Sequence, residues 1–241
     1  MKITDLKTFV VESSSRNYRN YVFVKVSTDQ HIYGWGEATI EGKERTVVQA
    51  IADLADYLVG KDPFRIEEHW YRMYRHTFWT GGALLNTAIS GVEQALWDIK
   101  GKALGLPVWK LLGGGFHKRI RAYASSLFGA TPHETAERGK RFIDQGFTAV
   151  KFGWEPMGQD ETTDIALVRE ARRGIGQEAD LMIDAGLCFD AKTALQRARR
   201  FEEFNVFWLE EPLMPDNYEG YRRLSESTSL RIAAGEEESE R

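Results

Sequence analysis

Three short apolar runs of this chain each end in an acidic residue: LMID (181–184), FWLE (207–210) and IAAGE (232–236). The three acids, Asp184, Glu210 and Glu236, are spaced at two equal intervals of 26 residues. An interval of that length accommodates one strand, one helix and two short connections. The spacing therefore predicts successive parallel strands that bring three carboxylates to the same rim of a barrel. Carboxylates held together repel one another unless a cation lies between them, so the pattern indicates a divalent metal site.

The second half of the chain continues this alternation of strand and helix. Two further strands are predicted ahead of the acidic runs, at RIRAYASS (119–126) and FTAVKFGW (147–154), and amphipathic segments separate all five. Such repetition with short loops is typical of a parallel sheet and favours a TIM-type barrel over 116–241. A barrel needs about eight strands, so we expect this chain to contain only the first part of that domain.

The first 115 residues have a different pattern, which predicts a small antiparallel sheet followed by helices. The predicted elements are strands at 3–12, 21–29 and 31–38 and helices over 45–60, from about Pro63, and from Asn86 to Leu104. The sequence therefore indicates an α/β protein with an α+β domain over 1–115 and a partial barrel domain over 116–241.

Composition excludes several classes of protein. The chain has 241 residues, of which 42% are apolar and 28% charged, and its formal net charge is -4, with no basic footprint for nucleic acid. No apolar run reaches the ~20 residues of a membrane span, and the first residues do not form a signal peptide. A single cysteine, Cys188, suits the cytoplasm; a buried small apolar residue is favoured over a reactive thiol at this position.

The order of several motifs resembles one known family. YGWGEATIEG (33–42), the segment AISGVEQALWDIKGKALGLPVWKLLGG (88–114) and the three acidic runs are similar to the enolase superfamily. Within it they resemble the mandelate racemase / muconate lactonizing enzyme group and its sugar-acid dehydratases. The resemblance extends over the whole chain and implies a capping α+β domain and a (β/α)7β barrel.

The same resemblance implies roles for individual residues. Asp184, Glu210 and Glu236 match the family's three ligands to one Mg²⁺ per subunit. Lys151 matches the first lysine of the family's Lys-X-Lys pair and is the candidate catalytic residue, with a plain ion pair at the barrel rim as the alternative. Gly153 stands where the second lysine, usually the base, would be.

Two further departures concern the proton-transfer groups. A histidine found two residues past the first ligand in galactonate dehydratases is replaced by Gly186, which weakens an assignment to galactonate. The family's other base is a His–Asp pair on the sixth and seventh strands, beyond Arg241, so we expect the general base to lie outside this sequence.

Substrate-binding residues are expected from the capping domain and from the rim of the barrel. The loop SSSRNYRN (13–20) resembles one that closes over the substrate, and Arg16, Tyr18 and Arg19 are candidates to bind its carboxylate or hydroxyl groups; a basic exposed loop is the alternative. Trp79 and Trp154 are candidate pocket walls, with a core tryptophan as the alternative for Trp79.

Together these observations predict an enzyme that removes the α-proton of a carboxylate substrate with the help of Mg²⁺, which would stabilise the enediolate. Dehydration of an aldonic or aldaric acid to a 2-keto-3-deoxy acid is the favoured outcome. Racemisation, epimerisation or cycloisomerisation of a hydroxy acid is the alternative, and a truncated, inactive chain that retains only the fold is another. The expected partners are a small-molecule carboxylate and, by resemblance, further copies of the chain in a homo-oligomer, with no nucleic acid and no membrane.

Overall fold

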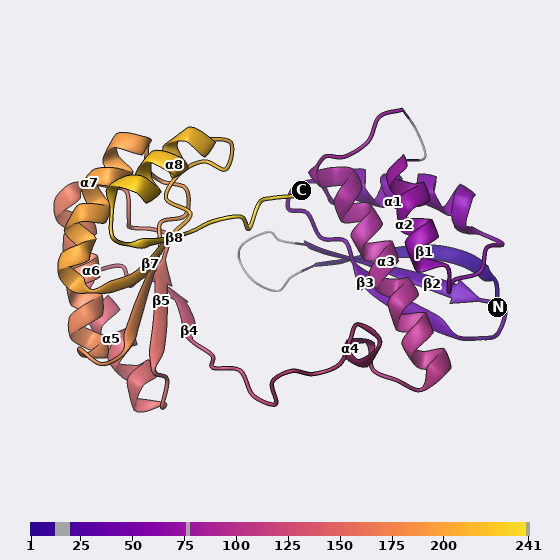
Figure 1. Ribbon diagram of the computed structural model, residues 1–241, viewed down its shortest axis with the longest axis horizontal. Helices are drawn as coiled ribbons and strands as arrows, with labels where there is room; N and C mark the ends of the chain where they lie inside the picture. Colours follow the sequence, from indigo (N-terminus) through magenta and orange to yellow (C-terminus); the bar gives the residue numbers. More distant parts are fainter. Residues whose placement is uncertain (13–19, 76–77, 240–241) are drawn as a thin grey trace. The chain divides into compact units, whose positions relative to one another are not determined.

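The structure is a computed structural model that describes residues 1–12, 20–75 and 78–239. The chain divides into two compact units, one of Met1–Lys118 with Ser239 and one of Arg119–Glu238, each with its own hydrophobic core. The boundary lies three residues past the 115/116 division expected from the sequence. Figure 1 traces the chain through both units.

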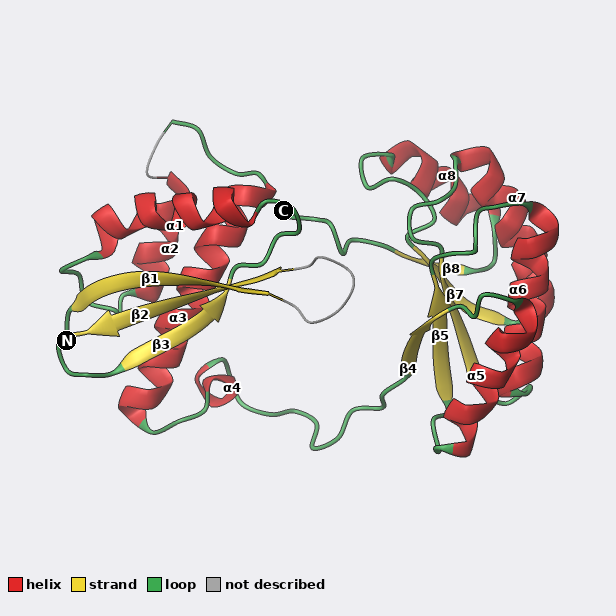
Figure 2. Cartoon of the chain, turned by 180° about the vertical axis from the view of Figure 1, so that it is seen from behind, coloured by secondary structure: helices red, strands yellow, loops and turns green. Residues whose placement is uncertain are grey.

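The N-terminal unit contains an antiparallel sheet in the order β1–β2–β3. Its alternating sequence places Val22, Val24 and Val26 on one buried face. That face packs against helices, and the bundle of helices beside the sheet is visible in Figure 2. The elements of this unit are β1 (Ile3–Glu12), β2 (Asn20–Thr28), β3 (Tyr33–Glu37), α1 (Glu44–Leu58), α2 (Ile66–Arg75), α3 (Ala83–Leu104) and α4 (Val108–Leu111).

Two glycines of the YGWGE segment allow α3 to lie directly on β3. A Cβ atom at Gly34 or Gly36 would be 1.9 Å from a carbonyl oxygen of α3, so no larger residue fits at either position. The helix in turn satisfies the backbone of β3, because the carboxylate of Asp98 accepts from the Trp35 N–H at 2.9 Å. This edge strand is therefore closed by side chains of the helix.

The second unit is a parallel sheet in the order β4–β5–β6–β7–β8, with helices α5, α6, α7 and α8 along one face (Figures 1 and 2). Its elements are β4 (Ala124–Leu127), α5 (Pro132–Asp144), β5 (Ala149–Gly153), α6 (Glu161–Ile175), β6 (Asp180–Asp184), α7 (Ala191–Phe201), η1 (Glu202–Phe204), β7 (Val206–Glu210), α8 (Tyr218–Ser227) and β8 (Arg231–Ala233). Mixed α/β architecture with the first five strands of a TIM-type barrel confirms the predicted fold class.

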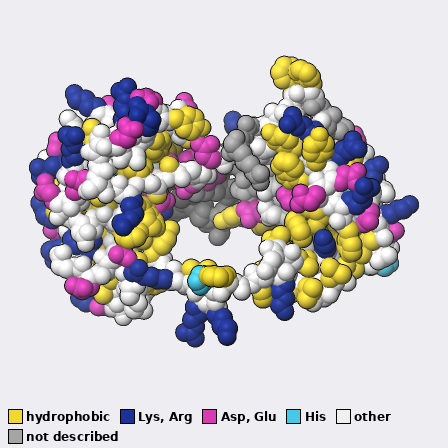
Figure 3. All heavy atoms as spheres, viewed as in Figure 1, with side chains coloured by type: hydrophobic (Ala, Val, Ile, Leu, Met, Phe, Trp, Pro, Cys, Tyr) yellow, Lys and Arg dark blue, Asp and Glu magenta, His cyan; other side chains and the backbone are white. Residues whose placement is uncertain are grey.

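Side-chain caps explain where the helices of this unit begin. Thr131, Asp160, Asp190 and Asn217 each accept a hydrogen bond from a backbone N–H three residues further on. These contacts satisfy donors that the first helical turn leaves free. On the face shown in Figure 3, basic and acidic side chains are interspersed over the surface of these helices.

Several boundaries differ from those predicted, among them the following three. The strand expected over 119–126 is limited to β4, because pairing with β5 starts only at Ala124 opposite Val150. The helix expected from about Pro63 starts at Ile66. The last strand ends at Ala233, so Glu236 lies beyond the strand that was expected to carry it. Among the helices of the described residues, none is long and apolar enough to cross a membrane.

Candidate active site at the carboxyl ends of the parallel strands

Asp184 and Glu210 are the last residues of two neighbouring strands, β6 and β7, and they stand opposite each other in the register. Gly153, the last residue of β5, is opposite Asp184 on the other side. Because parallel strands end at the same edge of a sheet, this register brings the two carboxylates together. The 26-residue interval between them therefore corresponds to one complete strand–helix unit, as the sequence indicated.

Lys151 lies between these two carboxylates. Its Nζ atom donates a hydrogen bond to Glu210 Oε1 and is 3.3 Å from Asp184 Oδ2. The side chains of Lys151, Asp184 and Glu210 are 12%, 7% and 15% exposed, respectively. The ion pairs are therefore largely shielded from water. The ion pair that was the alternative role of Lys151 is thus present in the structure.

Lys151 carries a proton in this arrangement. Burial by itself would lower the pKa of Lys151, but the hydrogen bond to Glu210 and the charges of Glu210 and Asp184 together raise it above the usual lysine value. The ammonium group therefore acts as a positive charge that compensates the two carboxylates. The other oxygen of Glu210, Oε2, accepts a hydrogen bond from Trp208 Nε1 at 2.8 Å, which fixes the orientation of the carboxylate.

Glu236 is less closely associated with this pair. It follows a turn after β8 and its side chain is exposed. Although the residue is exposed overall, partial burial of its carboxyl group, followed by the negative charges of Asp184 and Glu210, raises the pKa of Glu236. The third carboxylate therefore lies within electrostatic reach of the other two. Within residues 1–12, 20–75 and 78–239, however, no group of three His, Cys, Asp or Glu side chains is close enough together to hold a metal ion.

The chemistry of the side chains nevertheless fits a divalent cation with oxygen ligands. Asp184, Glu210 and Glu236 offer carboxylate oxygens alone, which suit Mg²⁺ and not Zn²⁺. The Nζ atom of Lys151 marks where a positive charge is stabilised between two of them. One ammonium cannot balance three carboxylates, and after burial the charges of Asp184 and Glu210 are the next causes of the raised pKa of Glu236.

The sequence did not reveal the role of Glu211, the residue that follows Glu210. Glu211 is 1% exposed. Its Oε1 atom accepts hydrogen bonds from the backbone N–H groups of Gly235 at 2.5 Å and Glu236 at 3.1 Å, and its Oε2 atom accepts from the Tyr221 hydroxyl at 2.8 Å. Glu211 therefore fixes the turn that carries Glu236. The only signal in the sequence was a second acid in the EEP segment, which does not distinguish a buried carboxylate from a solvated one.

Gly153 has a steric reason to be glycine. A Cβ atom at this position would be 2.6 Å from the Cβ atom and 2.8 Å from the carbonyl oxygen of Asp184. A side chain here, including the lysine found in relatives with a Lys-X-Lys pair, requires Asp184 to move. The absence of the second lysine is therefore coupled to the close packing of β5 against the end of β6.

Trp154 follows directly and stands at the same rim. Its backbone has φ of +67°, a left-handed conformation that is rare for an aromatic residue. Its N–H donates to the Asp184 carbonyl at 3.1 Å, and its ring, in a residue that is 44% exposed, lies against Gly186, where an added Cβ atom would be 3.1 Å away. The tryptophan ring thus occupies the space next to position 186, where the resemblance to galactonate dehydratases led us to expect a histidine.

A buried ion pair holds the loop that follows Trp154. Asp164, on α6, is fully buried; its Oδ1 atom accepts from the Gly158 N–H at 2.7 Å, and its Oδ2 atom accepts from Arg197 Nε of α7 at 2.7 Å. Sequence reasoning assigned Asp164 and Arg197 only to helices. Asp164 and Arg197 are 33 residues apart and meet because α6 packs against α7, so no local pattern in the sequence indicates their pairing.

The remaining sequence candidates have mixed outcomes. Arg16, Tyr18 and Arg19 lie outside the described residues. Trp79 is 82% exposed, which rules out the core tryptophan considered as its alternative.

Cys188 was expected to be buried, but it is exposed. The expectation failed because residues 185–190 follow β6 as a loop, where one side of the residue faces solvent. The thiol itself packs against Gly158, where an added Cβ atom would be 2.8 Å from Sγ. This burial of the thiol and the nearby charge of Asp164 raise the pKa of Cys188 to about 12, so a reactive thiolate is disfavoured.

Comparison with known proteins identifies both units. Residues 2–113 match the mandelate racemase / muconate lactonizing enzyme N-terminal domain, and residues 134–241 match the enolase C-terminal domain-like family. The chain is 40% identical over 242 residues to a D-galactonate dehydratase of Pectobacterium atrosepticum, an alignment that covers 98% of this chain and 62% of the relative.

Comparison with solved structures also finds members of the enolase superfamily. The 3,6-anhydro-D-galactonate cycloisomerase of Zobellia galactanivorans is 35% identical, with a TM-score of 0.87 over 98% of this chain and 66% of that one. A member of the enolase superfamily from Salmonella Typhimurium is 28% identical, with a TM-score of 0.88 over 98% of this chain and 68% of that one. The chain spans 62% of the length of the curated relatives it matches. By its two matched domains, its fold and its sequence identity, the chain belongs to the mandelate racemase / muconate lactonizing enzyme family of the enolase superfamily.

Proposed function

We propose that this chain carries the metal-binding residues of a sugar-acid dehydratase. The reaction removes the α-proton of an aldonic or aldaric acid and expels the β-hydroxyl group as water, which gives a 2-keto-3-deoxy acid. The observation that carries this proposal is the placement of Lys151 between Asp184 and Glu210 at the carboxyl ends of three adjacent parallel strands. Active sites of barrel enzymes are built at this end of the strands.

Asp184, Glu210 and Glu236 would hold Mg²⁺ at this rim. Bound there, Mg²⁺ would neutralise the negative charge that develops on the substrate carboxylate as the α-proton leaves. Lys151 would attract the same carboxylate with its ammonium group, and its raised pKa favours this role over that of a proton acceptor. Trp208 would orient Glu210, and Glu211 would hold the turn that presents Glu236.

The substrate would be a small carboxylate that contacts Trp154 at the rim, with Trp79, Arg16, Tyr18 and Arg19 as further contributors. The relatives at about 40% identity are D-galactonate dehydratases, which supports a sugar acid as the substrate class. Gly186 argues for a different member of that class, because the side chain that galactonate dehydratases carry there is missing. We place the enzyme in the cytoplasm as a homo-oligomer, on the family resemblance.

Cycloisomerisation is the second candidate reaction. It is supported by the 35% identity to the 3,6-anhydro-D-galactonate cycloisomerase. Both reactions begin with loss of the α-proton and differ in what the resulting carbanion does next. The sequence matches do not favour an inactive chain that retains only the fold.

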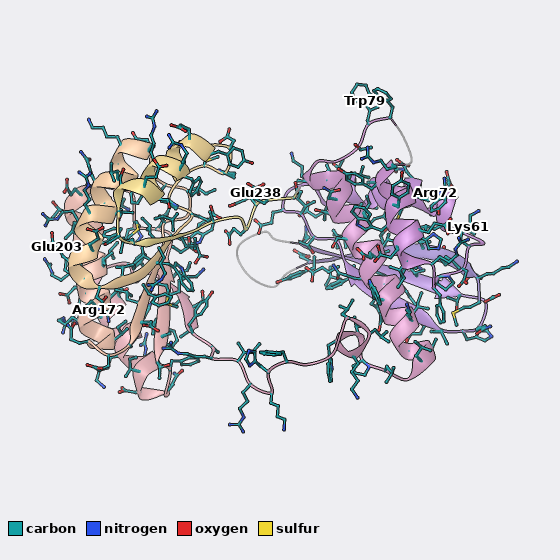
Figure 4. All side chains as sticks on the ribbon, in the orientation of Figure 1. Lys61, Arg72, Trp79, Arg172, Glu203 and Glu238 are labelled. Atoms are coloured by element: carbon teal, nitrogen blue, oxygen red, sulfur yellow. The ribbon has the colours of Figure 1, made fainter. Side chains whose placement is uncertain are left out.

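The proposal is tested by incubating the protein with Mg²⁺ and a panel of aldonic and aldaric acids and measuring 2-keto-3-deoxy acid formation. Glu210→Gln is expected to lower kcat/KM by about 10²–10³-fold, because it removes one charged ligand of the metal. Glu203→Gln is the matched control: Glu203 lies on η1 and its side chain is 55% exposed, so activity should be unchanged (Figure 4).

Two results would contradict dehydration. A stereoisomer that has exchanged its α-proton with solvent deuterium without loss of water indicates racemisation or epimerisation, and a constitutional isomer indicates cycloisomerisation. Equal activity of the Glu210→Gln and Glu203→Gln variants would refute the metal assignment itself.

A further inference from the structure

The N-terminal unit contains a cavity that the proposed reaction does not use. Its volume is about 780 Å³, within the range of about 300–1,000 Å³ that is usual for small-molecule sites. It is formed by the start of β1, the segment after α1 and one side of α2. All its lining residues lie between Met1 and Arg75, so the cavity belongs to one unit alone.

The lining of this cavity is strongly basic. Five cationic side chains contribute to it, those of Lys2, Lys61, Arg65, Arg72 and Arg75, against the carboxylates of Asp62 and Glu68. The chain as a whole has the opposite sign, with a formal charge of -4. A concentration of positive charge in one hollow of an acidic protein requires an explanation, because like charges repel.

The two carboxylates are already engaged with neighbouring groups. Glu68 lies between two arginines, with its Oε2 atom 2.5 Å from Arg65 Nε and its Oε1 atom 4.0 Å from Arg72 Nε. Asp62 Oδ1 accepts a hydrogen bond from the Phe64 N–H at 3.0 Å. Among the described residues, no carboxylate forms an ion pair with Lys2, Lys61 or Arg75.

Helix geometry explains how the cations converge. Arg65, Glu68, Arg72 and Arg75 follow one another at intervals of three, four and three residues, which places them along one side of α2. The side chains of Arg65 and Arg72 are 66% and 62% exposed, so a ligand from solvent can reach both, although each also faces Glu68. Figure 4 labels Arg72 and Lys61, which lie on the same side of the N-terminal unit.

The floor of the cavity is fixed and polar. His69 is 2% exposed, and its Nε2 atom donates to the Asp62 carbonyl at 2.7 Å, because a carbonyl oxygen can only accept. Its Nδ1 atom is 3.1 Å from the Tyr57 hydroxyl. Both ring nitrogens are engaged, so His69 holds the base of the cavity in place and leaves recognition to the cations around it.

We propose that this cavity binds a small polyanion, a ligand with at least two negative charges on phosphate or carboxylate groups. Arginine forks pair with both groups, and lysine supplies a point charge to either. A cavity closed on one side by His69 and Tyr57 suits a compact ligand in preference to a long chain. The site is independent of the proposed dehydration, since it shares no residue with Lys151 or the three acids.

Calorimetric titration of the 241-residue chain with pyrophosphate and with citrate tests this assignment. The titration is run in about 20 mM salt, where surface charges are weakly screened, and without divalent metal, so that the barrel carboxylates contribute nothing. The variant Lys61→Gln/Arg75→Gln removes two cations that have no carboxylate partner within residues 1–12, 20–75 and 78–239. The matched control, Lys192→Gln/Arg199→Gln, removes the same charges from exposed positions on α7.

The wild type and the control variant are expected to bind with equal affinity, and the Lys61/Arg75 variant about tenfold more weakly. Binding of pyrophosphate alone identifies a phosphate ligand, and binding of citrate alone identifies a carboxylate ligand. The assignment is overturned if the wild type binds neither anion at concentrations up to about 10 mM, because a dissociation constant above that value is too weak for a specific site. It is also overturned if both variants lose the same affinity, or if only a long polyanion such as heparin binds.

Discussion

The second unit contains two buried ion pairs that differ in their balance of charge. Between α6 and α7, the buried carboxylate of Asp164 has one guanidinium partner, Arg197, and a backbone N–H for its other oxygen. At the carboxyl ends of the strands, the ammonium of Lys151 faces both Asp184 and Glu210, with Glu236 nearby. Arg197 has a second partner, Glu161 at 3.3 Å, but that side chain is 60% exposed, so the first cluster has one buried carboxylate for its cation. The second has more buried carboxylates than cations.

This difference separates structural charges from charges available for binding. A balanced buried pair gains nothing from a further ion, and losing one partner leaves an uncompensated charge in the interior. Carboxylates that outnumber their cations repel one another, and a divalent cation bound between them relieves this repulsion. The helix pair therefore holds the loop after Trp154, and the strand-end cluster is where metal is expected to bind.

Removing the cation of the balanced pair should have the largest effect on stability. Arg197→Ala leaves Asp164 buried without its partner, and the expected loss is about 3 kcal/mol of unfolding free energy, measured by urea denaturation. Mg²⁺ should stabilise the wild type and Arg197→Ala by the same amount, because the variant leaves the strand-end cluster intact, so the difference between the two should persist. A difference that shrinks when Mg²⁺ is added would show that the two pairs are not independent.

Removing the cation of the unbalanced cluster should have a smaller effect, and one that metal reverses. Lys151→Gln leaves Asp184 and Glu210 to repel each other, so the metal-free chain should lose about 2 kcal/mol. Mg²⁺ at 100 times its dissociation constant should raise the free energy of unfolding by about 2.7 kcal/mol. Thermal melts with and without Mg²⁺ measure both quantities, and a variant that Mg²⁺ fails to stabilise would contradict the comparison.

Position 153 tests the geometry of the cluster without changing its charge. In Gly153→Ala, the new Cβ atom would be 2.6 Å from Asp184 Cβ, so we expect Asp184 to move, with a loss of about 1–2 kcal/mol and weaker binding of Mg²⁺. In the control Gly115→Ala, the nearest side-chain atom is 3.5 Å away and no such loss is expected. Unchanged Mg²⁺ affinity in Gly153→Ala would show that the position of Asp184 does not matter for metal binding.

The smallest effect is expected at Cys188, whose pKa responds to both ion pairs. Burial and the charge of Asp164 raise the pKa to about 12, with a smaller contribution from Asp184, while Arg197 lowers it. At pH 8 only about one thiol in 10⁴ is then ionised, so alkylation by iodoacetamide is slow and rises with pH toward the pKa. Mg²⁺ bound at Asp184 should lower this pKa slightly and raise the rate by up to about threefold. The rise should vanish in Glu210→Gln; a rise of the same size there would place the metal elsewhere.

The sequence predicted much of the fold because strands and helices have characteristic periods. The interval from Asp184 to Glu210 located β6 and β7 and the rim where their carboxylates meet. The same rule misplaced Glu236, because β8 ends at Ala233 and the chain turns at Gly235, which has φ of +114°. Residues 119–123 have an alternating pattern without a strand partner in the register, so the pattern alone predicted too long a strand.

By itself, the sequence determined the order of the elements, the family, and which acids stand near the end of each parallel strand. These properties follow from local periodicity and from spacing along the chain. Only the tertiary structure decided that Lys151 is the cation between Asp184 and Glu210, that Glu211 holds the turn before Glu236, and that Gly153 must lack a side chain. Each of these depends on atoms brought together from distant segments, and no local pattern encodes such distances.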